Sequence, residues 1–343
     1  MTYNELTGET VFKKNGKEPL EADAVIVDEM SMVDLPLMQA LLEAVKPGCR
    51  LVMVGDPDQL PSVGPGNVLG DLLRSHAVAA VSLTEVFRQA ERSAIIRNAH
   101  AVNSGRPPEL GSGQNDFFFL CRRAPDRLVQ TVVDLCRTRL PDKMGIPAGQ
   151  IQVLTPTRKG ETGTVSLNRA LQAALNPPAP GKRQKAWGDM IFRVGDRVMQ
   201  TRNNYDVLWE KDDGEAGSGI FNGDVGTVED IDPSGELVTI RFDDRTSVYT
   251  ADLLSQLDMA YAMTVHKAQG SEYRAVVLVS APAAPNLLVR GVLYTAITRA
   301  RELLVMVGDD AIPGRMAEND RRTRRYSGLR RRLKQGGSSH GHE

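Results

Sequence analysis

Residues 24–66 read AVIVDEMSMVDLPLMQALLEAVKPGCRLVMVGDPDQLPSVGPG. Two short apolar runs, at residues 24–27 and 51–54, flank a helical pattern whose first turn Asp34 can cap. Apolar runs that end in polar turns are typical of fully buried parallel strands. The pattern therefore predicts a βαβ unit, in which both strands run parallel and end at the same edge of a sheet.

Polar side chains directly follow each predicted strand. Asp28 and Glu29 follow the first strand, and Asp56 and Gln59 follow the second. Ligands bind at this edge of α/β sheets, where one carboxylate can hold Mg²⁺ and a neighbouring acid can accept a proton from water. A glutamine on the adjacent strand can sense a terminal phosphate, so the set suits nucleoside triphosphate hydrolysis. For the acid pair alone, a solvated turn after a buried strand would be the simpler interpretation.

Short motifs carry a resemblance to superfamily 1 helicases. Residues 28–31 (DEMS) and 55–61 (GDPDQLP) resemble motifs II and III, and the continuation to residue 66 resembles the RecD-like branch. Motifs IV, V and VI follow in family order at residues 87–89 (FRQ), 264–272 (TVHKAQGSE) and 294–301 (YTAITRAR). The resemblance implies an α/β fold of RecA-like P-loop NTPase lobes, the first incomplete, with an inserted small SH3-like β-barrel.

The resemblance also divides the chain into segments. We expect a partial first lobe, a second lobe in two pieces, a barrel between those pieces, and a basic C-terminal helix with a disordered tail. Short alternating segments between Gly, Asp and Asn turns favour the barrel independently. The expected ranges are 1–88 for the first lobe, 89–185 and 256–312 for the two pieces of the second lobe, 186–255 for the barrel, and 313–343 for the C-terminal helix and tail.

As the resemblance implies, ATP and Mg²⁺ bind between the two lobes. Asp28 would hold Mg²⁺, Glu29 would activate the attacking water, and Gln59 would couple the phosphate state to lobe movement. Arg88 and Arg299 would complete the catalytic set from the second lobe, because arginine presents a planar donor fork to a γ-phosphate. For Arg88 taken alone, a surface ion pair is the simpler interpretation.

Three further residues are expected at the nucleotide, namely Asp56, Gly270 and Glu272. Gly270 lets the backbone approach closely, and Glu272 can reach a ribose hydroxyl. Residues 287–301 are predicted to be helical, and Arg301 lies roughly 200° around that helix from Arg299. We therefore expect Arg301 to point away from the nucleotide.

Single-stranded DNA and duplex junctions are the implied partners, held by hydroxyl, amide and basic groups. The residues assigned to DNA are Thr157, Arg158, Asn203, Asn204, Thr264, His266 and Lys267. Simpler alternatives remain open: His266 as a satisfied core histidine, residues 155–160 as a solvated turn, and residues 203–205 as barrel turn residues. Tyr205 could stack on a base or pack in the barrel, and the C-terminal arginines could form a solvated helix face or a phosphate-binding tail.

Composition restricts these expectations further. The 343 residues carry a formal net charge of −1, so nucleic-acid binding must come from local basic patches. Three widely separated cysteines form no metal-ligand spacing and suit a reducing compartment. No apolar run approaches the roughly 20 residues that span a bilayer, and no signal-peptide pattern opens the chain. We therefore expect a cytoplasmic protein without membrane contact.

The phosphate-binding pattern Gly-x-x-x-x-Gly-Lys-Ser/Thr does not occur in these 343 residues. In the RecD-like family that loop lies upstream of motif II. We therefore expect a C-terminal fragment of a 5′–3′ helicase of recombination and repair, which needs the missing N-terminal lobe or a partner chain for ATP turnover. Two alternatives stay open, namely the helicase module of a conjugative relaxase and a non-catalytic DNA-binding half-motor.

Overall fold

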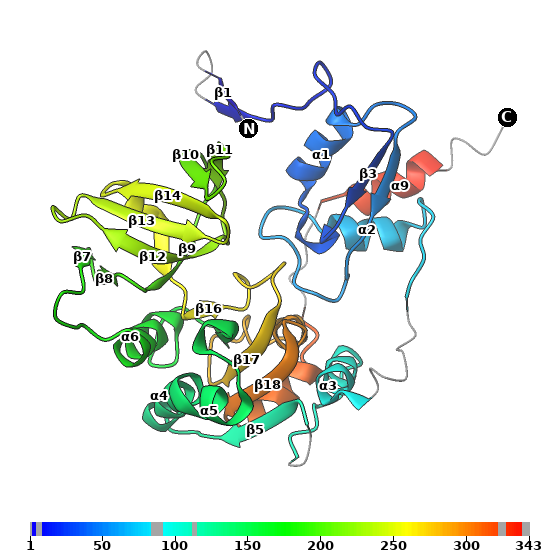
Figure 1. The fold of residues 1–343 in the computed structure, drawn as a ribbon. Helices are drawn as coiled ribbons and strands as arrows, with labels where there is room; N and C mark the ends of the chain where they lie inside the picture. Colours follow the sequence, from blue (N-terminus) through cyan, green and yellow to red (C-terminus); the bar gives the residue numbers. More distant parts are fainter. Residues whose placement is uncertain (1, 5–8, 84–91, 112–114, 322–326, 338–343) are drawn as a thin grey trace.

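The computed structural model describes residues 2–4, 9–83, 92–111, 115–321 and 327–337. Figure 1 shows three groups of elements: a small α/β unit, a parallel sheet covered by helices, and an antiparallel sheet beside them. Within the described residues, no helix is long and apolar enough to cross a bilayer. The expected segment boundaries stay predictions.

The predicted βαβ unit is confirmed. Strands β3 (Ala24–Val27) and β4 (Arg50–Met53) pair in parallel. Helix α1 (Leu35–Ala44) lies between them in the chain, and the Asp34 Oδ1 atom accepts a hydrogen bond from Leu37 N at 2.9 Å. This cap satisfies one of the N–H groups that a helix start leaves unpaired.

The prediction that both strands are fully buried is wrong. Their inward side chains, including Leu51 and Met53, pack with α1 and α2 (Val68–Ser75) around Met30. On the strands themselves, Ile26 is 72% exposed and Val52 is 47% exposed. A parallel strand is buried on both faces only when helices cover both faces. Among the described residues, the apolar cluster around Met30 covers one face of the sheet formed by β3 and β4.

The second α/β unit is a five-stranded, fully parallel sheet. Its order is β16–β6–β17–β18–β5, which places β6, buried at all five positions, between two neighbours. Side chains of β17 alternate between two apolar clusters, as the period of two for a strand requires. The strands are β5 (Phe117–Cys121), β6 (Ile151–Thr155), β16 (Ala262–Thr264), β17 (Tyr273–Ser280) and β18 (Ala300–Gly308).

Helices cover both faces of this sheet. One apolar cluster contains α4 and α6 residues, and the other contains α3, α7 and α8 residues. The helices are α3 (Ala94–Asn103), α4 (Pro125–Asp134), α5 (Leu140–Met144), α6 (Thr164–Leu175), α7 (Arg290–Ile297) and α8 (Ala311–Glu318).

The third group is a seven-stranded antiparallel sheet in the order β11–β10–β14–β13–β12–β9–β15. Strand β15 follows the segment expected to form the barrel, residues 186–255, and leads into β16. The antiparallel sheet is therefore continuous in the chain with the parallel one. The strands are β9 (Arg197–Gln200), β10 (Asn204–Lys211), β11 (Ala216–Ile220), β12 (Val225–Ile231), β13 (Leu237–Phe242), β14 (Arg245–Thr250) and β15 (Leu257–Met259).

Helix α9 (Leu329–Gly337) returns the chain to the first α/β unit, where it lies against α2 in Figure 1. The Ser327 hydroxyl donates a hydrogen bond to the Asp71 carboxylate at 3.0 Å. Leu329 and Leu333 pack on the apolar cluster of that unit, and the intervening arginines are exposed. The exposure of these arginines agrees with the solvated helix face considered for the basic tail.

A buried carboxylate joins the antiparallel sheet to the parallel one. Asp196 is fully buried and accepts hydrogen bonds from Gln172 Nε2 at 2.5 Å and Asn176 Nδ2 at 2.6 Å. It also accepts from Arg193 N at 2.7 Å and the Tyr261 hydroxyl at 2.8 Å. A buried carboxylate is tolerated when it is hydrogen-bonded in this way.

We predict that Asp196→Ala lowers the free energy of unfolding by about 3 kcal/mol, because buried donors lose their acceptor. Urea denaturation followed by tryptophan fluorescence measures the change. Asp206→Ala, at an exposed carboxylate of β10, is the control and should shift stability by less than about 0.5 kcal/mol. Equal midpoints for wild type and Asp196→Ala would contradict the role of this carboxylate.

Candidate nucleotide cleft and nucleic-acid interface

The loop after β4 is held by the second α/β unit. The backbone N–H of Leu60 donates to the Thr295 hydroxyl at 3.0 Å, and the Leu60 carbonyl accepts from Gln269 Nε2 at 2.6 Å. The Tyr294 hydroxyl donates to the Asp56 carboxylate at 2.8 Å. Residues 56–60 are therefore fixed at both ends by side chains from residues 269–295.

The same loop is packed tightly against its own unit. An added Cβ at Gly55 would lie 2.9 Å from the backbone nitrogen of Met30, so a larger residue cannot fit without movement. Asp56 Oδ1 accepts from Asp58 N at 2.9 Å, and Asp58 Oδ2 accepts from Asn103 Nδ2 at 2.9 Å. Close packing and these bonds set the direction in which the loop leaves β4.

The acid pair lies at the end of β3, as predicted from the sequence. Asp28 is exposed and its Oδ1 accepts from Glu29 N at 2.7 Å. Glu29 has a φ of 51°, a left-handed conformation that is uncommon for a residue with a Cβ. Backbone bonds from Met30 N to Val54 O and from Met32 N to Glu29 O, both 2.9 Å, hold this conformation. Such conformations are frequent at functional sites.

Asp28 could hold Mg²⁺ in the manner that this ion favours. Magnesium usually binds one or two carboxylates together with waters and substrate phosphates, and not a complete protein cage. The described residues contain no group of three or more His, Cys, Asp or Glu side chains that could hold a metal. One exposed carboxylate is therefore compatible with Mg²⁺ that arrives with a nucleotide.

Two polar side chains at the interface carry unpartnered atoms. The Gln59 Oε1 atom is buried and has no hydrogen-bond partner among the described residues. Arg299 is 4% exposed, and its NH1 donates to the Ser271 carbonyl at 3.1 Å, whereas its Nε has no described partner. A buried guanidinium with an unused donor is suited to an anionic ligand, because unsatisfied buried polar groups are costly.

The end of α7 corrects one prediction. The helix stops at Ile297, Arg299 lies in a turn, and β18 begins at Ala300, so Arg301 is on a strand and not on a helix. The Thr298 N–H bonds to Tyr294 O at 3.0 Å and closes the last helical turn. Apolar residues with short spacing on both sides made the helix and strand hard to separate from sequence.

Gly270, Glu272 and Arg88 were also expected at the nucleotide. Gly270 has a φ of 74°, and an added Cβ would lie 3.7 Å from Met32 Sδ, so this turn faces the segment that follows the acid pair. Glu272 is exposed. Arg88 lies outside the described residues.

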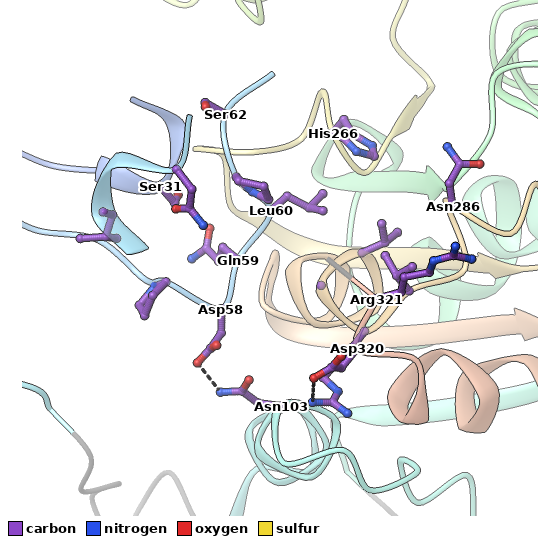
Figure 2. A pocket seen from close by; sticks show the side chains of 18 of the residues that line it. Ser31, Asp58, Gln59, Leu60, Ser62, Asn103, His266, Asn286, Asp320 and Arg321 are labelled. Carbon is purple, nitrogen blue, oxygen red and sulfur yellow. Dashed lines mark hydrogen bonds and ion pairs between the residues drawn. The ribbon is translucent and has the colours of Figure 1, made fainter. Parts of the chain in front are cut away.

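A cavity of about 290 Å³ lies between the loop after β4 and the start of α7. Figure 2 shows Gln59 and Leu60 on one side and His266 and Asn286 on the other. Burial lowers the pKa of His266, which favours the neutral imidazole. The cavity lining does not include Asp28, Glu29 or Arg299. Gln59 is thus the catalytic candidate that lines the cavity next to an expected DNA residue.

Two expected DNA residues, Lys267 and Asn203, are joined through Asn222 at the barrel. Lys267 Nζ donates to Asn222 Oδ1 at 2.5 Å and to the Thr201 carbonyl at 3.3 Å. The Asn222 N–H donates to Asn203 Oδ1 at 2.9 Å. Burial lowers the pKa of Lys267. Lys267 of motif V therefore forms one polar cluster with Asn203 and Asn222, which are the residues of the barrel turn.

Three more DNA candidates, Arg158, Thr157 and Asn204, bond to other groups of the protein. Arg158 forms an ion pair with Asp258 at 3.3 Å, and the Thr157 hydroxyl donates to Lys159 O at 3.2 Å. Asn204 Nδ2 donates to Gln256 Oε1 at 3.0 Å, which favours the structural alternative for this residue. Tyr205 packs edge-on against Phe221, with ring centroids 5.5 Å apart.

Sequence reasoning missed several residues that join the two units, namely Tyr294, Thr295, Gln269 and Asn103. The first two lie in motif VI, which also contains Arg299, and Gln269 lies in motif V. A buried hydroxyl that accepts a backbone N–H 235 positions away gives no local sequence signal.

Three segments of the chain match models of known protein families. Residues 167–242 match a model described as the ATP-dependent RecD-like DNA helicase SH3 domain. Residues 2–116 match an AAA domain, and residues 259–307 match a UvrD-like helicase C-terminal domain. Over most of its length the chain is similar to RecD-like helicases of superfamily 1.

Relatives of this RecD-like chain are longer than it is. The ATP-dependent RecD2 DNA helicase of Deinococcus radiodurans is 39% identical over 297 residues, which cover 87% of this chain and 38% of that protein. The RecBCD enzyme subunit RecD of Mycobacterium tuberculosis is 32% identical over 340 residues, which cover 95% of this chain and 56% of that subunit. The chain thus spans between about a third and somewhat more than half of these relatives.

A solved structure shares the fold. The Pif1 helicase from Candida albicans is 18% identical, with a TM-score of 0.50, and the match covers 93% of this chain and 77% of that one. The α/β fold expected from the motifs, with RecA-like lobes and an SH3-like domain, is confirmed.

We predict that Thr295→Val loosens the loop at residues 56–60, because the Leu60 N–H loses its buried acceptor. An unpaired buried donor costs about 1–3 kcal/mol, so amide exchange in this loop should accelerate roughly 5- to 150-fold. Hydrogen exchange with mass spectrometry measures the rate. Thr298→Val, which removes a hydroxyl bonded within the same helix end, is the control. Unchanged exchange in Thr295→Val would show that this contact does not hold the loop.

Proposed function

We propose that this chain is the motor portion of an ATP-dependent RecD-type DNA helicase. The observation that carries the proposal is the fixation of residues 56–60 by Thr295, Gln269 and Tyr294. This loop contains Gln59 and arises from one lobe, whereas its anchors belong to the other lobe. A change at the phosphate end of a nucleotide can therefore be transmitted to the second lobe through a short, hydrogen-bonded segment.

The proposed nucleotide site uses residues from both lobes. Asp28 would bind Mg²⁺, which neutralises phosphate charge, and Glu29 would accept the proton of the attacking water. Arg299 would donate its unpartnered Nε–H to the terminal phosphate, Gln59 would accept a hydrogen bond from the attacking water through its unpartnered Oε1, and Arg88 would add a second guanidinium. Proposed supporting contacts to the nucleotide come from Asp56, Gly270 and Glu272.

We further propose that another polypeptide segment or a partner chain supplies the phosphate loop. The exposed strand side chains Ile26 and Val52 form an apolar face that such a segment could cover. The phosphate-binding pattern is absent from the 343 residues, so the lysine and hydroxyl that usually hold the phosphates and Mg²⁺ have no counterpart here.

We expect the purified chain to hydrolyse ATP negligibly, with or without single-stranded DNA, because it contains no phosphate loop. Phosphate release in the presence of ATP, Mg²⁺ and oligo(dT) measures this. A longer protein that includes the phosphate loop is the positive control, and Asp28→Asn in that protein should abolish turnover. Turnover by the 343-residue chain at rates typical of enzymes, about 1–1000 per second, would refute the proposal.

Single-stranded DNA is the proposed track, with 5′ to 3′ movement. The polar cluster of Lys267, Asn222 and Asn203 offers an ammonium group and amides to phosphates, and Arg158 and Thr264 lie near Lys267 around a common cavity. These local groups explain how a chain with a net charge of −1 can bind a polyanion.

We predict that Lys267→Met weakens oligo(dT) binding and lowers the slope of log K against log salt by about 0.7, the value for one phosphate contact on a single strand. Because burial lowers the pKa of Lys267, its contribution is lost at a lower pH than that of an exposed lysine as pH rises. Fluorescence anisotropy measures both effects. Lys143→Met, at an exposed site on α5, is the control. An unchanged slope in Lys267→Met would exclude a phosphate contact.

A further inference from the structure

A second cavity, of about 730 Å³, lies where the barrel region meets the parallel sheet. Its walls come from α6, from residues 258–267, and from a hairpin of β7 (Gln184–Trp187) and β8 (Met190–Arg193). The hairpin forms a two-stranded sheet of its own, in which Trp187 pairs with Met190. The volume is in the range of sites that hold small organic ligands.

The lining combines one indole with an excess of positive charge. Trp187 is half-buried, and three buried methionines contribute apolar surface. The charged lining residues are Arg158, Arg169, Arg193 and Lys267 against Asp189 and Asp258. Four cations against two acids favour an anionic ligand, and the indole favours a flat aromatic group.

The walls are fixed by buried hydrogen bonds. Asn168 Nδ2 donates to Met259 O at 3.0 Å and to Ala262 O at 2.9 Å. These bonds connect α6 to the segment that precedes motif V in the chain. Gln172 Nε2 donates to Ile191 O at 2.7 Å and ties the same helix to the hairpin. Because these contacts order the walls, a ligand would enter a cavity that is already formed.

One lining residue connects the cavity to the proposed DNA track. Lys267 lines the cavity and also donates to Asn222, which is bonded to Asn203 in the barrel turn. A chain of phosphates that passes this cluster would therefore run along the mouth of the cavity. The tyrosine considered for base stacking, Tyr205, is already packed against Phe221.

We propose that this cavity takes one unpaired base of a single strand. The base stacks on the Trp187 indole, and the flanking phosphates contact Lys267 and Arg158. This inference rests on the proposed DNA-binding function and adds a specific base site to it. Every base has a π-face, so the site should tolerate any sequence but require a base.

The chain contains two tryptophans, and this permits a direct test. Trp209 lies in β10 with Arg245 5.7 Å from its ring centre. In a Trp209→Phe variant of the full chain, Trp187 is the sole indole. We expect oligo(dT) to quench its emission, and an abasic oligonucleotide of equal length to bind with much less quenching. Anisotropy of a labelled oligonucleotide reports binding separately in each case.

Affinity variants provide an independent readout. Trp187→Ala should weaken oligo(dT) binding roughly 5- to 150-fold, which corresponds to the loss of one stacked base. Trp187→Phe keeps an aromatic face and should retain most of the affinity, with urea midpoints confirming that both variants fold. Binding by anisotropy without quenching, and with equal affinity for Trp187→Ala, would overturn the base site but leave DNA binding intact. No binding by anisotropy would overturn both proposals.

Discussion

The structure depends on a short loop that leaves one lobe and is hydrogen-bonded by the other. Leu60 donates its N–H to Thr295 and accepts from Gln269, and Asp56 accepts from Tyr294. The position of Gln59 between these anchors follows directly. Backbone groups of a loop must find partners when they are buried, and here the second lobe provides them. These hydrogen bonds therefore fix the direction in which the loop runs as well as the residues that it contacts.

Two features at this interface have an energetic cost in the protein alone. Glu29 adopts a left-handed conformation, and Gln59 and Arg299 contain buried polar atoms without a described partner. Such features persist where the surrounding structure holds them in place, and they are frequent at functional sites. A bound anion would accept from Arg299 Nε, and a water held by that anion would donate to Gln59 Oε1, which would link ligand binding to the closeness of the lobes.

Strong local patterns were predictable from sequence. The βαβ unit, the cap by Asp34 and the barrel-like region follow from apolar periodicity and turn residues. The end of α7 was not predicted, because residues 298–302 (TRARE) contain no Gly or Pro that would mark a helix end, and the backbone bond of Thr298 closes the last turn. The burial of β3 and β4 was overestimated, because an apolar run does not reveal how many helices cover a sheet.

The amino-acid sequence by itself determined the resemblance to RecD-like helicases, the acid pair at one strand end, and the order of the motifs, since these depend on residues close together in the chain. Tertiary structure alone decided that Thr295 holds Leu60, that Lys267 joins the barrel turn, and that Trp187 lines a cavity with Lys267. The two hydrogen bonds join residues that are 235 and 45 positions apart in the chain. Contacts between distant segments depend on how the elements pack, and local periodicity carries no information about that packing.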